Sequence, residues 1–388
     1  MTTDRLQMKW IFTASLLNNT GNSLLWPLTT VYMHNYLHQT MTMAGIVMFL
    51  LSMSMMIGNY VGGWLFDHWK PYMAAVLPVT LATISTILLA IFDQWPAFAV
   101  WLCLISFADG ASLTVINSYG TAVPTHSSRY VFNLLYMALN IGVVIGTLLV
   151  GILLPIGPHL VFGVSAAIYV AFLILTLLTF NVKLERGGGH HSRHDQSPHN
   201  NRRGIRVVYA LCLCFVTLYL SYVLWESIMS VRITDMHIPF FAYSLLWTVN
   251  GALIMIFQPL MNNLAGYIST RVQVILGLSI FAFSFIPLIF AHTFAMFLID
   301  FIILTIGEMM GVPSVPAYID ELTDPLEAGK YQGMTNIAMS IGRAIGPLYG
   351  GLIIDHFNYE TLFLSVFVMM ALSILYMAMV SRHQAHQK

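Results

Sequence analysis

Residues Met334–Ile353 read MTNIAMSIGRAIGPLYGGLI, an apolar stretch long enough to cross a bilayer, with Arg343 at its middle. Four glycines surround the arginine: Gly342, Gly346, Gly350 and Gly351. Glycines four residues apart lie on one face of a helix and let another backbone approach closely. The stretch therefore predicts a membrane helix packed tightly against a neighbour, and its buried cation requires a counter-charge.

The remainder of the chain has the same apolar character. Of its 388 residues, 58% are hydrophobic and only 8% are charged, against about 25% charged in soluble domains. Runs of about 20 apolar residues match the thickness of the bilayer core. Twelve such spans are predicted, at residues 10–33, 43–65, 72–92, 96–122, 131–155, 160–181, 206–230, 240–262, 272–291, 294–318, 332–354 and 361–381. The sequence thus predicts an all-α polytopic membrane protein.

The basic residues predict the orientation of these spans. With the N-terminus inside, fourteen of the 16 lysines and arginines fall on the inner side, Arg232 falls outside and Arg343 lies within a span. This distribution follows the positive-inside rule. We therefore expect a multi-pass protein of the cell (cytoplasmic) membrane with both termini in the cytoplasm.

The longest predicted loop, residues 182–205, is rich in Gly, His and basic residues. Such a composition is typical of a flexible linker, here between an N-terminal bundle, 1–181, and a C-terminal bundle, 206–388. Its histidines are also residues that bind transition metals, but nothing in the sequence fixes their geometry, and we predict no metal site.

The two predicted bundles carry an internal repeat. An offset of 200 residues aligns three glycines of each half: Gly142, Gly146 and Gly151 with Gly342, Gly346 and Gly351. An offset of 199 aligns Trp26 with Trp225 and Asp109 with Glu308. Two parallel halves of six helices are typical of transporters that alternate access to a site at mid-membrane.

The chain resembles the major facilitator superfamily and, within it, is most similar to the twelve-helix drug:proton antiporters. The stretch GGWLFDHWK resembles motif A through Gly63, Leu65, Asp67 and Lys70, although its later glycine and arginine–lysine pair are missing. Span 131–155 resembles motif C with Thr147 in place of proline, and the full Gly-x-x-x-Gly-Pro-x-x-Gly-Gly form stands in span 332–354. The arginine of motif B is absent. The resemblance implies two pseudo-symmetric six-helix bundles and secondary transport.

Two groups of residues are predicted to serve movement of the bundles. Asp67, expected on a tight loop, can bind helix N-terminal amides or Arg129; with Gly63 and Lys70 it forms a predicted gating loop. The glycine-rich faces allow sliding between helices, or static packing in the alternative. These helix-packing residues are Gly142, Gly146, Gly151, Gly342, Gly346, Pro347, Gly350 and Gly351.

Five charged residues fall inside the predicted spans: Asp109, Glu226, Asp300, Glu308 and Arg343. A charge at the bilayer centre costs roughly 2.5–3.5 kcal/mol on insertion scales. Glu308 lies on the helix before Arg343 at a similar depth, so we predict an ion pair between them, either permanent or exchanged during transport.

Carboxyl groups in such spans are candidate proton carriers. Burial raises the pKa of a carboxyl group and a nearby cation lowers it. Glu226 and Asp109 have no evident basic partner in the sequence, so we rank them above Glu308, and we place Asp300 at the outer interface. In the alternative, Glu226 is a carboxylate that snorkels to the surface.

The resemblance places the substrate cavity on the first, fourth, seventh and tenth spans. Their polar and aromatic members are Asn18, Asn19, Asn22, Trp26, Tyr32, Asn117, Tyr119, Tyr222 and Trp225. With the acids, this lining suits amphipathic or cationic molecules and does not suit nucleic acid or polyanions. In the alternative, these side chains bond helix to helix.

The predicted function is proton-coupled efflux of amphipathic or cationic compounds by a monomer, driven by the proton gradient without a cofactor. The alternative is proton-coupled import of a sugar, peptide or organic acid. The spans contain no Gly-x-Ser-x-Gly or His-x-x-x-His pattern, so an enzyme is not expected.

Overall fold

The computed structural model describes residues 7–121, 128–182, 202–265, 267–323 and 328–385, and these residues form helices joined by short connections. The first half contains α1 (Met8–Val31), the short π-helix η1 (Tyr32–Tyr36), α2 (Met41–His68), α3 (Pro71–Ile91), α4 (Ala97–Thr121), α5 (Ser128–Leu153) and α6 (Pro158–Thr179). The second half contains α7 (Arg202–Asp235), α8 (Phe240–Ala265), α9 (Thr270–Ser284), the 3-10 helix η2 (Pro287–Phe290), α10 (Phe294–Gly311), α11 (Ser314–Leu322), α12 (Ala328–His356) and α13 (Tyr359–Ala385).

Helices dominate because a spanning segment must satisfy its backbone polar groups internally. Eleven candidate spans are long and apolar enough to cross a membrane among the described residues. α1 is not one of them: its 24 residues include Asn18, Asn19 and Asn22, which lower its hydropathy. Proline stands at the start of α3 and of α6, where the missing N–H is not needed.

The chain divides into two compact units. Unit 1 comprises Met1–Gln39, Ile46–Ser192 and Pro239–Trp247, and unit 2 comprises Thr40–Gly45, Arg193–Ile238 and Thr248–Lys388. The units therefore differ from the predicted bundles, 1–181 and 206–388, by the first residues of α2 and of α8. The predicted linker falls mostly on residues 183–201, which lie outside the described part of the chain.

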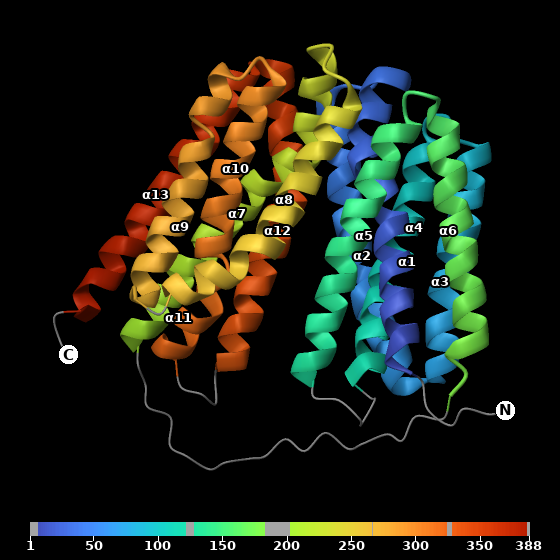
Figure 1. The fold of residues 1–388 in the computed structure, drawn as a ribbon, viewed down its shortest axis with the longest axis horizontal. Coiled ribbons are helices and arrows are strands. Elements are labelled where there is room, and N and C mark those ends of the chain that lie inside the picture. The colour runs from blue at the N-terminus through green and yellow to red at the C-terminus, as the bar shows by residue number, and fades with distance from the viewer. Residues whose placement is uncertain (1–6, 122–127, 183–201, 266, 324–327, 386–388) are drawn as a thin grey trace. The chain divides into compact units, whose positions relative to one another are not determined.

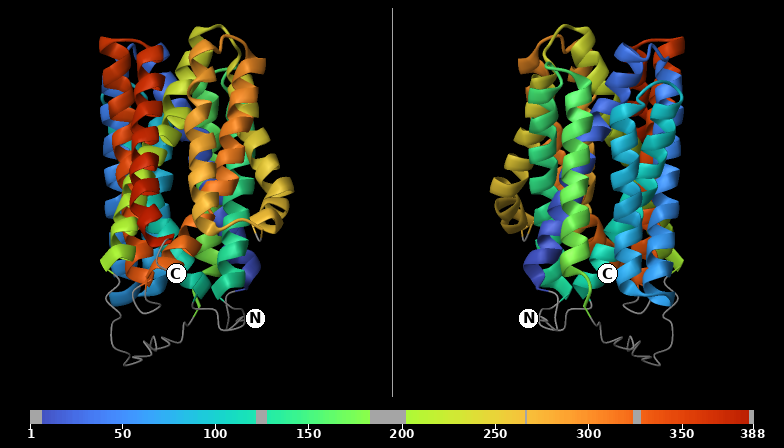
Figure 2. Two further views of the ribbon diagram at one scale, coloured as in Figure 1. Left: turned by 90° about the vertical axis from the view of Figure 1, so that its left-hand side faces the viewer. Right: turned by 90° about the vertical axis from the view of Figure 1, so that its right-hand side faces the viewer.

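The same helix pairings occur within each unit, as the 200-residue repeat predicts. In unit 1, α1 packs on α5 and α6, and α3 packs on α4. In unit 2, α7 packs on α12 and α13, and α9 packs on α10. Figures 1 and 2 show these helices side by side within each unit.

Close backbone contacts explain the spacing of the glycines. A Cβ atom on Gly146 would lie 2.5 Å from the Ser23 side chain of α1, and one on Gly346 would lie 2.6 Å from the Leu220 carbonyl oxygen of α7. Real Cβ atoms do not approach other atoms this closely, so α1–α5 and α7–α12 each form a glycine seam, defined by Gly142 and Gly146 on α5 and by Gly342 and Gly346 on α12.

The remaining glycines of the repeat contact other elements. Gly151 faces Phe241 and Ser244 at the start of α8 within unit 1, and Gly351 faces Met41 at the start of α2 within unit 2. Gly350 faces side chains of α7, and Pro347 lies inside α12. Whether these contacts slide during transport stays a prediction.

Candidate functional site

Unit 2 contains an ion pair between α7 and α12. The Arg343 Nη2 atom donates to both carboxylate oxygens of Glu226, at 2.6 Å and 2.7 Å. The Glu226 side chain is 13% exposed and the Arg343 side chain 41% exposed. The predicted Glu308–Arg343 pair is therefore wrong, and so is the expectation that Glu226 has no basic partner.

The α7–α12 seam explains why Arg343 pairs with Glu226. Arg343 follows Gly342, whose Cβ would lie 2.5 Å from the Val216 carbonyl oxygen. This approach holds the α12 backbone against α7, so the arginine meets the acid on α7. As predicted, the glycines bring the counter-charge close. The helix that carries it is α7, however, and not α10, the preceding transmembrane helix.

Glu308 lies in a hydrogen-bond network with uncharged partners. The Asn250 amide nitrogen donates to Glu308 Oε2 at 3.2 Å and to Thr305 Oγ1 at 3.0 Å. The Tyr222 hydroxyl also bonds the Glu308 carboxylate, which interacts electrostatically with Glu226 and Arg343. We name this group of five residues the unit-2 polar cluster: Tyr222, Glu226, Asn250, Glu308 and Arg343.

In unit 1 the acid Asp109, on α4, is buried. Its side chain is 2% exposed, and its Oδ1 atom accepts a hydrogen bond of 2.6 Å from the Tyr169 hydroxyl of α6. The Thr83 hydroxyl of α3 donates to the Tyr169 backbone oxygen at 3.1 Å, which joins three helices around the acid. Asp109 Oδ2 has no hydrogen-bond partner among the described residues. No cation of the described part of the chain pairs with it.

Three of the predicted cavity residues are packed inside their units. Tyr32 is buried and donates to Asp93 at 2.7 Å. Tyr119 is buried and donates to the Phe180 backbone oxygen at 3.2 Å. Trp225 is fully buried, with its ring centroid 4.5 Å from that of Phe301. The observed contacts of these three side chains therefore match the alternative reading, in which they connect elements of the bundle and do not line a substrate cavity.

The other cavity candidates retain some surface, except Asn18, which is buried. Asn19 is half-buried and donates to the Ser15 backbone oxygen at 2.7 Å. Trp26 packs edge-on against Trp247, with centroids 5.1 Å apart. The remaining half-buried candidates are Asn22, Asn117 and Tyr222. A substrate role for all of them stays a prediction.

The predicted gating loop differs from the observed local structure. α2 continues to His68, so Asp67 lies in the last turn of that helix and not on a loop. Only Trp69 and Lys70 separate the end of α2 from Pro71, where α3 begins, so the connection is shorter than predicted. Asp67 and Lys70 are exposed. Gly63 meets only the Thr114 side chain, at an ordinary 3.5 Å. The Arg129 side chain lies outside the described residues.

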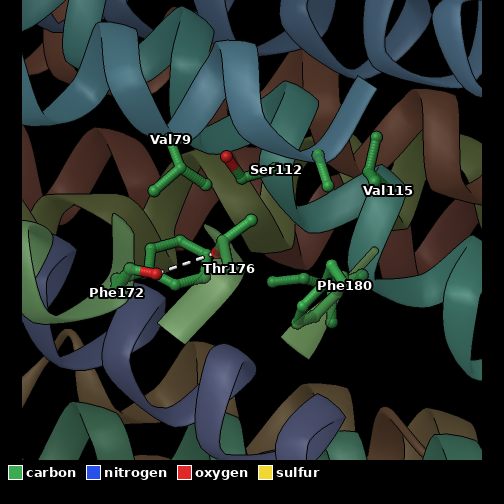
Figure 3. A pocket seen from close by; sticks show the side chains of 8 residues that line it. Val79, Ser112, Val115, Phe172, Thr176 and Phe180 are labelled. Carbon is green, nitrogen blue, oxygen red and sulfur yellow. Dashed lines mark hydrogen bonds between the residues drawn. The ribbon is translucent and has the colours of Figure 1, made fainter. Parts of the chain in front are cut away.

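One small cavity lies inside unit 1, between α3, α4 and α6 (Figure 3). Its lining is mainly apolar, with Val79, Phe172 and Phe180 around the buried hydroxyl of Ser112. None of the predicted cavity residues lines it. All of its lining residues belong to unit 1.

Two site residues escaped the sequence analysis: Asn250 and Tyr169. Each is a polar side chain in an otherwise apolar span, the signal by which both could have been found. Among the described residues, no group of three or more His, Cys, Asp or Glu side chains could hold a metal ion.

Two repeated units of membrane-spanning helices, with acids and an arginine on those helices, define a multi-pass membrane transporter of the helical-bundle class. Comparison with known proteins gives the family. The model of the Major Facilitator Superfamily matches residues 11–225 and 210–388, so the chain belongs to this superfamily. The predicted fold class is thereby confirmed, and the protein is a transporter and not an enzyme.

Two curated relatives come from Bacillus subtilis (strain 168). The chain is 34% identical to the MFS-type transporter YttB over 369 residues, which covers 95% of the chain and 93% of YttB. It is 22% identical to the MFS-type transporter YhjO over 365 residues, covering 92% of the chain and 88% of YhjO.

Solved structures share the fold at low sequence identity. The POT family transporter PepTSo matches with a TM-score of 0.78 at 13% identity and covers 98% of both chains. The nucleoside transporter NupG matches with a TM-score of 0.77 at 13% identity, covering 96% of this chain and 99% of its own.

Proposed function

We propose that this protein exports amphipathic or cationic organic compounds in exchange for protons, by alternating access. The observation that carries the proposal is the Glu226–Arg343 ion pair, with Glu308 in electrostatic reach of both. Such a cluster has two acids for one cation, so one negative charge is left for a proton or for a cationic substrate to neutralise.

The pair also supplies a switch. Protonation of Glu226 removes the charge that holds Arg343, and Glu308 is then the acid left to balance the guanidinium. A cationic substrate competes with both the proton and Arg343 for the Glu226 carboxylate. Asp109, bonded to the neutral Tyr169 hydroxyl, is the second proton carrier, because its ionised form has no cation to stabilise it.

The proposed substrate contacts come from the half-buried aromatic and amide side chains. Trp26 and Tyr222 offer aromatic faces to a cation, and Asn19, Asn22 and Asn117 offer hydrogen bonds. We further propose a monomer in the cell membrane with both termini in the cytoplasm, as the distribution of Lys and Arg favours.

One observation favours a second candidate, proton-coupled import of a small nutrient that carries a carboxylate. The Arg343 side chain is 41% exposed, and a guanidinium binds carboxylates in bidentate geometry. A substrate carboxylate in place of Glu226 would reverse the preferred charge of the cargo.

Transport into everted membrane vesicles, with and without a pH gradient, tests both candidates. A panel of lipophilic cations and of small carboxylates is offered to the wild type, Glu226→Gln and Asp109→Asn, with Glu321→Gln as an exposed control on α11. Export predicts gradient-driven uptake of cations that is lost in both test variants and kept in the control. Full gradient-driven transport by both test variants contradicts the proton mechanism, and uptake of carboxylates by right-side-out vesicles alone favours import.

A further inference from the structure

A second charged site lies in unit 2, away from the polar cluster. Asp300 occupies the second turn of α10, and its side chain is 1% exposed. Neither carboxylate oxygen has a hydrogen-bond partner among the described residues. The sequence analysis placed Asp300 at the outer interface, but the helices around it bury it, so solvent does not satisfy this acid.

Arg232 on α7 is the cation that interacts electrostatically with Asp300. It is 4% exposed, yet no ion pair within 4.0 Å joins the two side chains. Its Nη2 atom donates to the Ala291 backbone oxygen at 3.3 Å, while Nε and Nη1 have no partner in the described structure.

Aromatic rings also lie around the Arg232 guanidinium. The guanidinium carbon lies 4.8 Å from the Phe363 ring centroid, 5.1 Å from that of Tyr359 and 5.9 Å from that of Phe297. Cation–π contacts of this kind favour the charged guanidinium. They do not depend on whether Asp300 is ionised or neutral.

The position in unit 1 that corresponds to Arg232 in the repeat is Tyr32, which lies beside an acid with hydrogen-bond partners. Tyr32 stands 200 residues before Arg232 and packs in the same way, 4.8 Å from the Phe98 ring centroid. Its hydroxyl donates to Asp93 at 2.7 Å, and the His159 Nδ1 atom lies 3.0 Å from the same Asp93 oxygen. Asp93 thus has two side-chain partners, whereas Asp300 has no hydrogen-bond partner among the described residues.

We propose that Asp300 is a proton-binding site with Arg232 as its fixed counter-charge, separate from the Glu226–Arg343 pair. A buried carboxylate without hydrogen-bond donors is strongly disfavoured in the ionised form, and a neutral carboxyl group is disfavoured less. Nothing in the packing requires the ionised form, so the group is free to exchange a proton. The inference does not depend on the proposed direction of transport or on its substrate.

Other ionisable groups contribute to the charge around this site. Those that act on Arg232 or on its neighbour Tyr359 are Tyr359, Glu360, Asp235 and Asp355. They come from α7, α12 and α13, so a pH effect must be assigned to Asp300 by substitution and not by pH dependence alone.

Infrared difference spectroscopy of the full-length protein in lipid, between two pH values, tests the proposal without any substrate. The wild type is expected to show a carboxyl C=O band that Asp300→Asn lacks. Asp320→Asn, which changes an exposed acid on α11, is the matched control and keeps the band. Arg232→Gln is expected to change the midpoint pH of the band by about one unit or more, because it removes the counter-charge.

Asp300→Glu keeps the carboxyl group and is expected to show the band at a changed frequency, which decides the question even where Asp300→Asn does not fold. A difference spectrum of folded Asp300→Asn identical to that of the wild type overturns the proposal. Because the readout is the carboxyl band itself, its failure is distinguishable from a failure of proton-coupled transport.

Discussion

Asp109 in unit 1 and Glu308 in unit 2 stand 199 residues apart in the repeat, and both accept hydrogen bonds from uncharged side chains. Asp109 is buried, and Glu308 is half-buried. Asp109 accepts from Tyr169 and Glu308 accepts from Asn250. The Glu226–Arg343 pair has no such counterpart among the described residues of unit 1. At offsets of 200 or 199 the matching positions hold uncharged residues: Trp26 or Pro27, and Val143 or Val144.

The comparison separates what the two units share from what distinguishes them. Both units use a glycine seam between the first and fifth helices of the repeat, and both place an acid on the fourth. Only unit 2 adds an ion pair across its seam within the described structure. The glycine seam and the acid of the fourth helix are thus repeated, whereas the ion pair across the seam distinguishes unit 2 among the described residues.

The largest expected effect tests whether the scaffolds are equivalent. Gly146→Leu and Gly346→Leu each force a side chain into the backbone of the facing helix, and each is expected to destabilise the protein by roughly 3 kcal/mol or more. Thermal unfolding of the purified protein measures this. Gly163→Leu on α6, which meets nothing within 4 Å, is the matched control. A large loss in only one of the two seams would break the equivalence.

The next effect concerns the pair that only unit 2 has. Arg343→Gln leaves Glu226 without its cation and is expected to reduce transport at least about tenfold, which corresponds to 1.4 kcal/mol. The double variant Glu226→Gln with Arg343→Gln is expected to recover stability relative to either single variant, with a coupling of about 0.5–3 kcal/mol. The exposure of Arg343 places it toward the lower end. Additive effects in this double-mutant cycle would show that the pair has no energetic role.

A smaller effect distinguishes the two hydrogen-bonded acids. Tyr169→Phe removes the donor to Asp109 and is expected to lower the free energy of unfolding by about 1–3 kcal/mol. Asn250→Leu is expected to cost less, because Tyr222 still bonds Glu308. Melting of both variants in the same lipid or detergent gives the order. A larger loss for Asn250→Leu than for Tyr169→Phe would mean that the hydrogen bond to Glu308 stabilises the protein more than the one to Asp109.

The smallest effect concerns the contact between α2 and α4 in unit 1, where a glycine lies at the interface. The corresponding helices of unit 2, α8 and α10, are joined by a hydrogen bond from the Gln258 side chain to the Met309 backbone oxygen at 3.2 Å. A Cβ on Gly62 would lie 2.6 Å from the Ala111 backbone, so Gly62→Ala is expected to destabilise. Gly63→Ala has room and is expected to be neutral or to stabilise by up to about 1 kcal/mol. Equal melting temperatures for this matched pair would contradict the tight packing at Gly62.

Much of the fold was predictable because it depends on local composition. The predicted span 332–354 lies within α12, and 206–230 lies within α7. The predicted span 294–318 was less accurate: the structure ends α10 at Gly311 and begins α11 at Ser314, beside Pro313, which cannot donate a backbone hydrogen bond.

The candidate site was predictable in its members more than in its partners. The buried acids and Arg343 were visible as charges in apolar spans, because each carries a high insertion cost. The partners of these charged residues were not predictable from the sequence. The order of helices suggested Glu308 for Arg343, but the α7–α12 glycine seam brings Arg343 to Glu226. The repeat held a usable signal: Gly142 and Gly146 align with Gly342 and Gly346, so one pairing of helices implies the other.

The amino-acid sequence alone determined that this protein spans a membrane, that its helices repeat, and which polar side chains enter the apolar spans. These are properties of single segments, because hydropathy and glycine spacing act along one helix. Only the tertiary structure decided that Arg343 faces Glu226, that Asp109 faces Tyr169 and that Asp300 meets no hydrogen-bond donor in the described part of the chain. Such contacts depend on the rotation and the crossing of two helices, which no single segment encodes.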